Sequence, residues 1–346
     1  MKYKKLGKTA LKVSQLCLGT MTFGSNFRNI GTVSEELALD LVKNALDSGI
    51  NFFDTADVYS FGESEIILGN VIKRLGLKRH ELIIATKVRS ASTQEAFENK
   101  GDMNNIGLSR KHIIEACDAS LKRLQVDYID LYQVHGWDIL ASIEEALDAL
   151  DMLVKAGKVL YTGCSNWSAR HIMKALYLSK ANRWAEFVSL QAYYSLVGRD
   201  VEHELLPLCK EENLAFLPWS PLSGGFLTGK YTRENPKPQN ARRSGFEFPP
   251  IDERAYDAIE VLDKIAKQKS VSIAQVALAW LLSKQEVTSV IIGANKMSQL
   301  QDNIKSIHVE LSDEEVKMLD NVTQPKTLYP QWMYEMQNQN RDKLEY

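Results

Sequence analysis

The stretch Asn51-Phe-Phe-Asp54-Thr-Ala-Asp-Val-Tyr59 combines a short apolar strand with ionisable side chains. The strand is expected over residues 52–56, so Asp54 lies within it and Tyr59 follows shortly after its end. Two later strand-like runs also finish on an ionisable residue: residues 82–87 end in Lys87, and residues 127–135 end in His135. A buried strand carries a charge only at high cost unless the charge is paired. Three consecutive strands that end in this way predict one shared site.

The rest of the chain alternates between strand-like and helical segments. Strands are expected at residues 15–20, 52–56, 82–87, 127–135, 159–165, 187–193, 215–219 and 287–292. Helices are expected at residues 34–46, 63–75, 109–125, 142–156, 168–179, 202–212, 252–268, 273–283 and 297–304. Eight strand–helix units predict an α/β fold, a closed (β/α)8 TIM barrel, as a single domain over residues 1–346. An N-terminal β-hairpin is expected within residues 2–14, and extra C-terminal helices, one of them starting at Ser312, precede a polar tail.

An open, doubly wound sheet is the main alternative to the barrel. Such a sheet normally carries a glycine-rich turn with dinucleotide-binding spacing after its first strand. The segment Gly19-Thr-Met-Thr-Phe-Gly24 lacks that spacing. In a barrel, the loops at the carboxyl ends of the strands build the active site, which would place Asp54, Lys87 and His135 on one rim.

Composition excludes several classes of function. The formal net charge of −2 gives no electrostatic reason to expect nucleic acid or an anionic membrane as a partner. No run of 18 or more apolar residues is present, and the basic N-terminus lacks the apolar core of a signal peptide. Four widely spaced cysteines favour a reducing compartment, so a cytoplasmic location is expected. The six histidines show no metal-ligand spacing, and no metal is expected.

The ionisable residues suggest proton-transfer chemistry. Tyr59 is the candidate acid, but a free phenol has a pKa of about 10. The Lys87 ammonium would lower the pKa of Tyr59, and Asp54 would pair with Lys87 and keep it charged. His135 would then bind and orient the substrate oxygen.

These motifs resemble the aldo-keto reductase family from Leu6 to about Leu319. The resemblance rests on Asp54-Thr-Ala-Asp-Val-Tyr59, Gly62-Glu-Ser-Glu-x-x-Leu-Gly69, Lys87, His135, Gly163-x-Ser-Asn166, Gln191 and Trp219-Ser-Pro-Leu. It implies that Asp54, Tyr59, Lys87 and His135 are catalytic. It also implies an oxidoreductase that binds NADP(H) in an extended form across the barrel mouth and reduces an aldehyde, ketone or sugar carbonyl. The most similar branch contains bacterial general aldehyde reductases and potassium-channel β subunits.

Polar and aromatic residues at later strand ends are candidates for the cofactor site. Ser165, Asn166 and Gln191 carry groups that can hydrogen-bond a carboxamide, and the Trp219 ring can stack on nicotinamide. The resemblance adds further cofactor positions: Gly19, Thr20, Met21, Asp54, Ser220, Pro221, Leu222, Gly224, Lys230, Gly293, Asn295, Lys296, Gln299, Asp302 and Asn303.

Two local departures from known patterns matter. Residues 224–230 satisfy Gly-x-x-x-x-Gly-Lys, but Tyr231 stands where an ATP-binding loop needs Ser or Thr, so an ATP site is not expected. Many relatives carry arginine where this chain has Asn295, which leaves Lys296 as the cation for a 2′-phosphate and weakens the case for strict NADP preference.

Two other functions compete with carbonyl reduction. One is a cofactor-sensing or regulatory subunit with little turnover, which resembles the channel β subunits. The other is a Schiff-base aldolase that uses Lys87, although pairing with Asp54 would keep the amine protonated. The substrate is expected to meet residues 23–33, 90–108, 233–250 and the tail near residues 329–332. Their aromatic residues, together with a tryptophan just after the fourth strand, predict an apolar or sugar-stacking pocket: Phe23, Phe27, Trp137 and Trp332.

Overall fold

Eight parallel strands form the centre of the molecule. The computed structural model describes residues 1–25, 30, 32–91, 93–98, 100–239, 243, 247–339 and 341. The strands are β3 (Leu16–Gly19), β4 (Phe52–Asp54), β5 (Ile83–Val88), β6 (Ile129–Val134), β7 (Val159–Ser165), β8 (Phe187–Tyr193), β9 (Ala215–Trp219) and β10 (Val290–Ile292). Their order is β10-β3-β4-β5-β6-β7-β8-β9. A bridge between Phe216 and Val287, with a bond from Thr288 N to Phe216 O of 2.9 Å, joins the two ends and nearly closes the barrel.

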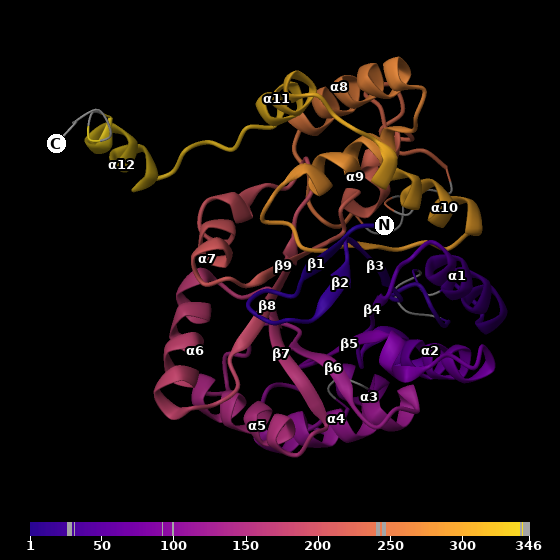
Figure 1. The fold of residues 1–346 in the computed structure, drawn as a ribbon, viewed down its shortest axis with the longest axis vertical. Helices are drawn as coiled ribbons and strands as arrows, with labels where there is room; N and C mark the ends of the chain where they lie inside the picture. Colours follow the sequence, from indigo (N-terminus) through magenta and orange to yellow (C-terminus); the bar gives the residue numbers. More distant parts are fainter. Residues whose placement is uncertain are drawn as a thin grey trace.

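A ring of helices surrounds these strands (Figure 1). The ring contains α1 (Glu35–Asp47), α2 (Glu63–Arg74), α4 (Arg110–Leu124), α5 (Ile143–Lys155), α6 (Ala169–Asn182), α7 (Leu205–Glu211), α9 (Ile273–Ser283) and α10 (Met297–Lys305). Two further helices, α8 (Arg254–Lys269) and α11 (Asp313–Val322), pack together beside α9. The predicted (β/α)8 barrel with extra C-terminal helices is therefore confirmed.

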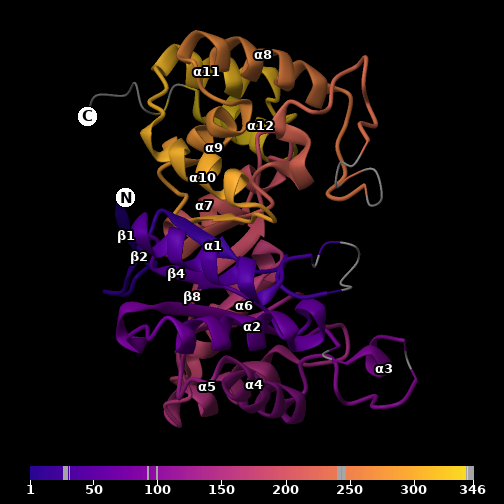
Figure 2. The ribbon, with the colours of Figure 1, turned by 90° about the vertical axis from the view of Figure 1, so that its right-hand side faces the viewer.

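The predicted N-terminal hairpin is also confirmed, as β1 (Tyr3–Lys5) paired with β2 (Lys12–Ser14). It lies at the end of the barrel opposite the short helix α3 (Gln94–Phe97) (Figure 2). Leu6 and Val13 of the hairpin are fully buried in the apolar cluster inside the barrel. Gly7 has φ 56°, and an added Cβ there would collide with the backbone oxygens of Val188 and Asn213. The hairpin thus closes one end of the barrel and leaves the other end for the site.

Alternation along the strands separates two apolar cores. Phe52 and Ala85 belong to the cluster inside the barrel, whereas Phe53 and Ile84 belong to the larger cluster between strands and helices. Successive side chains of a strand point to opposite faces, so residues two positions beyond Phe52 and Ala85 also face the barrel interior. This register aims Asp54 and Lys87 inward.

Several predicted boundaries were wrong. The strand expected over residues 52–56 ends at Asp54, and the strand expected over residues 287–292 is limited to Val290–Ile292. The helix expected over residues 202–212 is divided into a 3₁₀ turn, Asp200–Glu202, and α7. The supposedly polar tail contains α12 (Gln331–Asn338), which lies apart from the barrel in Figure 1.

The predicted aromatic pocket is also wrong in part. Phe23 is fully buried in the core, so its side chain cannot contact a substrate. Trp332 lies on α12, away from the strand ends. Phe27 lies outside the described residues. Among the four predicted aromatics, Trp137 remains near the expected site, because it follows β6 directly after His135 and Gly136.

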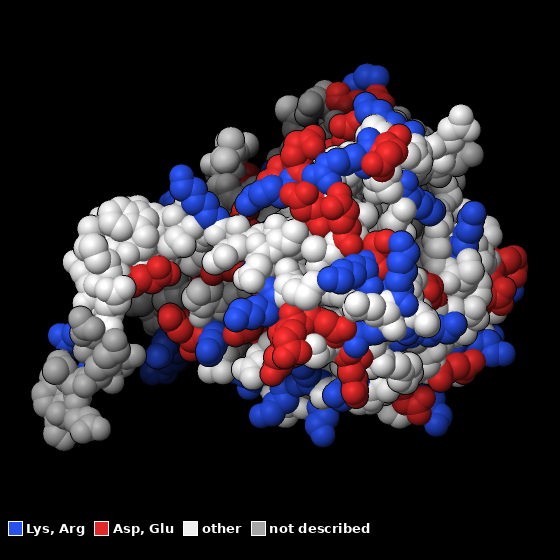
Figure 3. Space-filling view, turned by 90° about the horizontal axis from the view of Figure 1, so that it is seen from above, with Lys and Arg blue, Asp and Glu red and all other residues white. Residues whose placement is uncertain are grey.

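The surface does not carry one dominant charge on the face seen in Figure 3, where acidic and basic side chains are interspersed. Within the described residues, no helix has both the length and the apolar character needed to cross a bilayer.

Candidate active site

Three adjacent strand ends bring Asp54, Lys87 and His135 to the same end of the barrel. β4, β5 and β6 are neighbours in the sheet, and parallel strands direct their carboxyl ends to one rim. Each side chain lies two or four residues beyond a residue of the interior cluster and therefore points inward; those residues are Phe52, Ala85 and Leu131.

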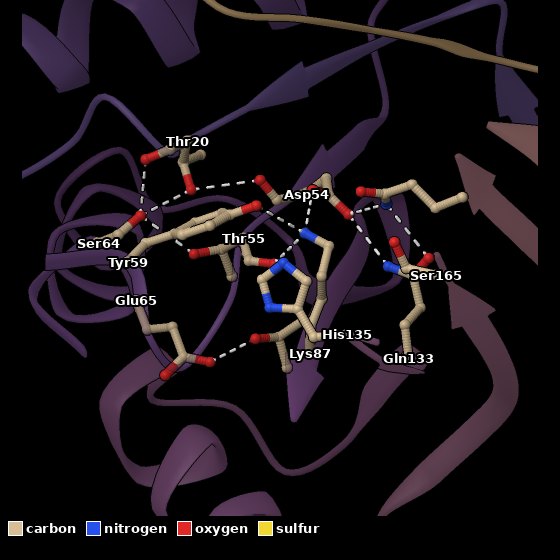
Figure 4. Close-up of polar contacts among 12 residues, drawn as sticks. Thr20, Asp54, Thr55, Tyr59, Ser64, Glu65, Lys87, Gln133, His135 and Ser165 are labelled. Atoms are coloured by element: carbon tan, nitrogen blue, oxygen red, sulfur yellow. Dashed lines mark hydrogen bonds and ion pairs between the residues drawn. The ribbon is translucent and has the colours of Figure 1, made fainter. Parts of the chain in front are cut away.

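Lys87 occupies the centre of this group, and its side chain is fully buried. Its ammonium donates hydrogen bonds to Asp54 Oδ1 at 2.5 Å, Thr55 O at 2.8 Å and Tyr59 Oη at 3.2 Å (Figure 4). An ammonium has three N–H donors, so each of them meets an acceptor. The buried positive charge is therefore completely satisfied and held against the tyrosine hydroxyl.

The Asp54 carboxylate is held equally firmly. Its Oδ2 accepts hydrogen bonds from Gln133 Nε2 at 3.1 Å and from Gln191 Nε2 at 2.9 Å. Gln191 Nε2 also donates to Gln133 Oε1 at 3.2 Å. This amide network fixes the carboxylate that fixes Lys87.

Tyr59 reaches Lys87 because the chain turns sharply directly after it. Ser60 and Phe61 both adopt left-handed conformations, with φ of 48° and 52°, and each such non-glycine residue costs on the order of 1–3 kcal/mol. Ser60 Oγ donates to Phe23 O at 3.1 Å and helps to hold the turn. The buried Phe23, predicted to contact a substrate, instead supports the position of Tyr59.

The expected lowering of the tyrosine pKa is wrong. Burial raises the pKa of Tyr59 above its usual value, and the nearby Lys87 ammonium only partly counteracts this effect. The sequence identified the ammonium but gave no measure of the desolvation. Tyr59 is consequently a protonated phenol at neutral pH.

The pKa values of Lys87 and His135 are shifted in opposite directions. Burial disfavours the charged form of Lys87, but Asp54 and Tyr59 more than offset it and raise the pKa of Lys87 above its usual value. Burial, together with the charges of Lys87 and Arg89, holds the pKa of His135 well below its usual value. The site therefore contains a permanent cation and a neutral imidazole, whose ring meets the Tyr59 ring edge-on at 5.7 Å between centroids.

The residues expected at the nicotinamide retain complementary hydrogen-bonding capacity. Asn166 Nδ2 donates to His135 O at 3.1 Å and to Ser165 Oγ at 3.0 Å. No acceptor for the Ser165 hydroxyl hydrogen lies among the described residues, so this hydrogen is available for an external acceptor. Both N–H groups of Gln191 are engaged with Asp54 and Gln133, whereas no donor among the described residues reaches its Oε1. One donor and one acceptor side by side fit a carboxamide.

Trp219 lies at the end of β9 with Tyr193 and Phe248 against its ring. The centroid of the Trp219 ring is 5.1 Å from that of Tyr193 and 5.8 Å from that of Phe248, which is nearly parallel to it. Trp219 Nε1 donates to Asn166 Oδ1 at 3.0 Å. Stacking of nicotinamide on Trp219 stays a prediction.

The residues directly after β9 form a tight turn. Gly224 N donates to Ser220 Oγ at 3.0 Å, and Gly224 has φ 65° with Phe248 O only 2.5 Å from where a Cβ would lie. Arg243, which the sequence analysis did not identify, donates a hydrogen bond of 3.2 Å to Ser223 O, which belongs to this turn. Of the other predicted phosphate-side residues, Pro221 is buried, Leu222 is partly buried and Lys230 is exposed.

The segment after β10 uses several predicted cofactor residues for its own structure. Gln299 Oε1 accepts from Asn295 N at 3.0 Å, and Asn303 Nδ2 donates to Gly293 O at 3.4 Å. The Asp302 carboxylate accepts from Ser272 Oγ and Gln275 Nε2, both at 2.7 Å. Lys296, the N-cap of α10, is exposed, and a Cβ at Gly293 would meet open space.

The carboxyl end of the first barrel strand, β3, lies beside Asp54 and Tyr59. Gly19 ends β3, and Thr20 N donates to Asp54 O at 2.9 Å. Met21 packs on the small cluster that contains Tyr59. Cofactor contacts by these three residues stay predictions.

Sequence reasoning missed Gln133 and a buried acidic network behind the site. Gln133 lies two residues before His135, so its inward position was available from the alternation of the strand. Glu65 is fully buried and accepts from Thr86 Oγ1 at 2.5 Å and Arg123 Nε at 2.6 Å. Asp57 is also fully buried, and burial raises its pKa well above its usual value. Asp57 and Glu65 both lie within motifs quoted from the sequence, but nothing in those motifs indicated that the two carboxyl groups are buried.

The sequence model of the "Aldo/keto reductase family" matches residues 15–324. Versiconal hemiacetal acetate reductase of Aspergillus parasiticus is 34% identical over 342 residues, which cover 95% of this chain and 99% of that protein. The uncharacterized oxidoreductase YrpG of Bacillus subtilis is 36% identical, over 93% of this chain and 96% of that protein.

A relative of a different functional class is similarly close. A probable voltage-gated potassium channel subunit beta of Oryza sativa is 36% identical over 335 residues. The match covers 94% of this chain and 98% of that protein.

Proposed function

The chain belongs to the aldo/keto reductase family, and we propose that it reduces an aldehyde, ketone or sugar carbonyl to the alcohol with NADP(H). The observation that carries this proposal is the contact of the Tyr59 hydroxyl with the Lys87 ammonium at 3.2 Å, backed by Asp54 at 2.5 Å. This arrangement supplies a proton and stabilises the charge that its departure leaves behind.

Tyr59 is the proposed proton donor. The phenol gives its proton to the carbonyl oxygen as the carbonyl carbon is reduced, and the Lys87 ammonium stabilises the resulting phenolate. His135 is neutral, so it donates a single N–H to the same oxygen without competing as an acid. Bound across the barrel mouth, the nicotinamide would supply the hydride.

Ser165 and Gln191 are the proposed holders of the carboxamide, as donor and acceptor respectively. Lys296 is the proposed contact of a 2′-phosphate, because it is exposed and precedes α10. The turn at residues 220–224, which Arg243 braces, is the proposed site of the pyrophosphate. These assignments favour NADPH over NADH.

The arrangement of Lys87 does not support a Schiff-base aldolase. Such an aldolase needs a neutral amine as nucleophile. Here the Asp54 carboxylate keeps the amine protonated, because it raises the pKa of Lys87. Lys87 is consequently an electrostatic partner of Tyr59.

A cofactor-sensing subunit is the second candidate function. It is favoured by the similarity to plant proteins described as probable voltage-gated potassium channel β subunits. Such a role would use the same cofactor residues with little turnover. The cytoplasmic location expected from the sequence fits both candidates and stays a prediction.

The two candidates are separated by a turnover experiment. Purified protein is incubated with NADPH and a panel of aldehydes, ketones and sugars, and NADPH oxidation is followed at 340 nm. A reductase oxidises NADPH with at least one carbonyl and loses this activity in Tyr59→Phe. NADPH binding without turnover on any carbonyl would instead support the sensing role.

A further inference from the structure

Arg89 lies at the rim of the candidate active site, directly after β5. Val88 pairs with Val134 of β6, and His135 N donates to Val88 O at 2.8 Å. Arg89 and His135 are therefore neighbours on adjacent strands. The effect of the Arg89 charge on the pKa of His135 is a second sign of this proximity.

The Arg89 side chain runs along the backbone that follows His135. Its Nε donates to Trp137 O at 3.2 Å. A Cβ added to Gly136 would lie 3.9 Å from Arg89 Cδ, so the arginine side chain passes close to this glycine.

The charge of Arg89 is not neutralised within the part of the chain that the structure describes. No carboxylate there forms an ion pair with it, and its side chain makes no hydrogen bond there beyond that of Nε. Asp138, in the loop after β6, instead accepts hydrogen bonds from the amides of Leu108 at 2.7 Å and Leu140 at 2.9 Å. A partly buried guanidinium normally finds an anionic or polar partner. Among the described residues, neither Nη group of Arg89 has such a partner.

The backbone at Arg89 is in a conformation that favours glycine. Its φ is 138°, and Gly107 N donates to Arg89 O at 2.8 Å, which holds this geometry. Non-glycine residues in sparsely populated regions persist where the surroundings impose them and cluster at functional sites. A glycine would relieve the strain, yet the chain places an arginine there.

We propose that Arg89 is an anion-binding position of the active site and takes a carboxylate carried by the carbonyl substrate. The two Nη groups form a planar fork that matches the two oxygens of a carboxylate. The substrate class is thus an aldehyde or ketone with a carboxylate beyond the reacting carbonyl. This inference rests on the proposed carbonyl reduction and deepens it.

The test compares two benzaldehydes that differ only in the para group, which is a carboxylate in one and its neutral methyl ester in the other. 4-Carboxybenzaldehyde carries the carboxylate, and its methyl ester, methyl 4-formylbenzoate, is neutral. A hydrogen-bonded contact with a charged group corresponds to roughly a tenfold to hundredfold preference, so kcat/KM of the wild type favours the acid by about that factor. In Arg89→Gly, which removes the guanidinium and relieves the backbone, the preference falls to about one.

Two further variants define the origin of the preference. Arg89→Lys keeps a point charge but loses the fork, so it retains only part of the preference. Arg170 is exposed in the first turn of α6, at the same end of the barrel. Arg170→Leu removes one positive charge without touching the proposed position and keeps the wild-type preference.

Binding is measured separately from turnover. Calorimetric titration of 4-carboxybenzaldehyde into Tyr59→Phe, with NADPH present, gives the affinity for this substrate. In the double variant Arg89→Gly/Tyr59→Phe, this affinity weakens by about the same factor as the kcat/KM preference. Equal preference for acid and ester in the wild type, or a preference that survives Arg89→Gly, overturns the proposal. If no carbonyl is turned over, the proposed reductase function fails, and the two binding titrations still decide whether Arg89 binds the carboxylate.

Discussion

Removal of the Lys87 ammonium in Lys87→Met tests the electrostatic design of the site. The ammonium contacts the Tyr59 hydroxyl at 3.2 Å and is fully buried. A hydrogen bond to a charged group contributes about 1.5–3 kcal/mol, and this contact strengthens when Tyr59 becomes a phenolate. We therefore expect kcat for reduction to fall by about tenfold to hundredfold.

The direction of the pH effect follows from the pKa of Tyr59. Reduction needs the protonated phenol, and burial raises the pKa of Tyr59 above its usual value, so reduction by the wild type does not lose rate to phenol ionisation between pH 6 and pH 9. Alcohol oxidation needs the phenolate and rises with pH over the same range. Lys87 acts to lower this pKa, so in Lys87→Met the pKa rises further. At pH 9, the ratio of kcat for alcohol oxidation to kcat for carbonyl reduction is then lower in Lys87→Met than in the wild type.

The assay uses protiated and C4-deuterated NADPH for reduction and protiated and deuterated alcohol for oxidation, so that in each direction the chemical step is known to limit the rate. Loss of the ammonium also leaves the Asp54 carboxylate buried, which costs about 3–5 kcal/mol of stability. The double variant Asp54→Asn/Lys87→Met removes both charges and is expected to recover much of that stability in urea unfolding. An unchanged oxidation-to-reduction ratio in folded Lys87→Met would refute the role of Lys87 and leave it a structural ion pair.

Three further results are expected. Lys296→Ala brings the dissociation constants of NADPH and NADH together from a tenfold to hundredfold difference, the size of a charge-assisted contact; an unchanged ratio in a fluorescence titration would move the phosphate contact elsewhere. Because the pKa of His135 lies well below its usual value, His135 stays neutral from pH 8 to pH 6, and kcat for reduction shows no loss from imidazole protonation in this interval; a fall centred near pH 6.5 would contradict this. Gln133→Leu removes one donor to Asp54 and lowers kcat by about tenfold with little effect on NADPH affinity, whereas an equal loss of both would indicate a general distortion.

The positions of Asp54, Lys87 and His135 were predictable because they depend on strand periodicity and parallel order. A buried ionisable residue at the end of a strand needs a partner, and adjacent parallel strands bring such residues together. The same periodicity would have identified Gln133, two residues before His135. These features are local, so the sequence contains them.

Other features depend on tertiary structure. The pKa of Tyr59 is set mainly by burial, which no local pattern reports. Arg243 meets the turn at Ser223 only because the chain folds back on itself 20 residues later. The sequence did not indicate that Phe23 is buried in the core, nor that Trp332 lies on a separate helix.

The central claim is that Tyr59 donates the proton, and Tyr59→Phe tests it most directly. The substitution removes one oxygen and keeps the ring beside His135, so the cofactor site is unchanged. General acid catalysis contributes about 10²–10⁴-fold; accordingly kcat for reduction of a good carbonyl substrate falls by that factor, while the NADPH dissociation constant stays within a few-fold of the wild type. A Tyr59→Phe protein that keeps near wild-type kcat, with the chemical step limiting, would contradict the assignment.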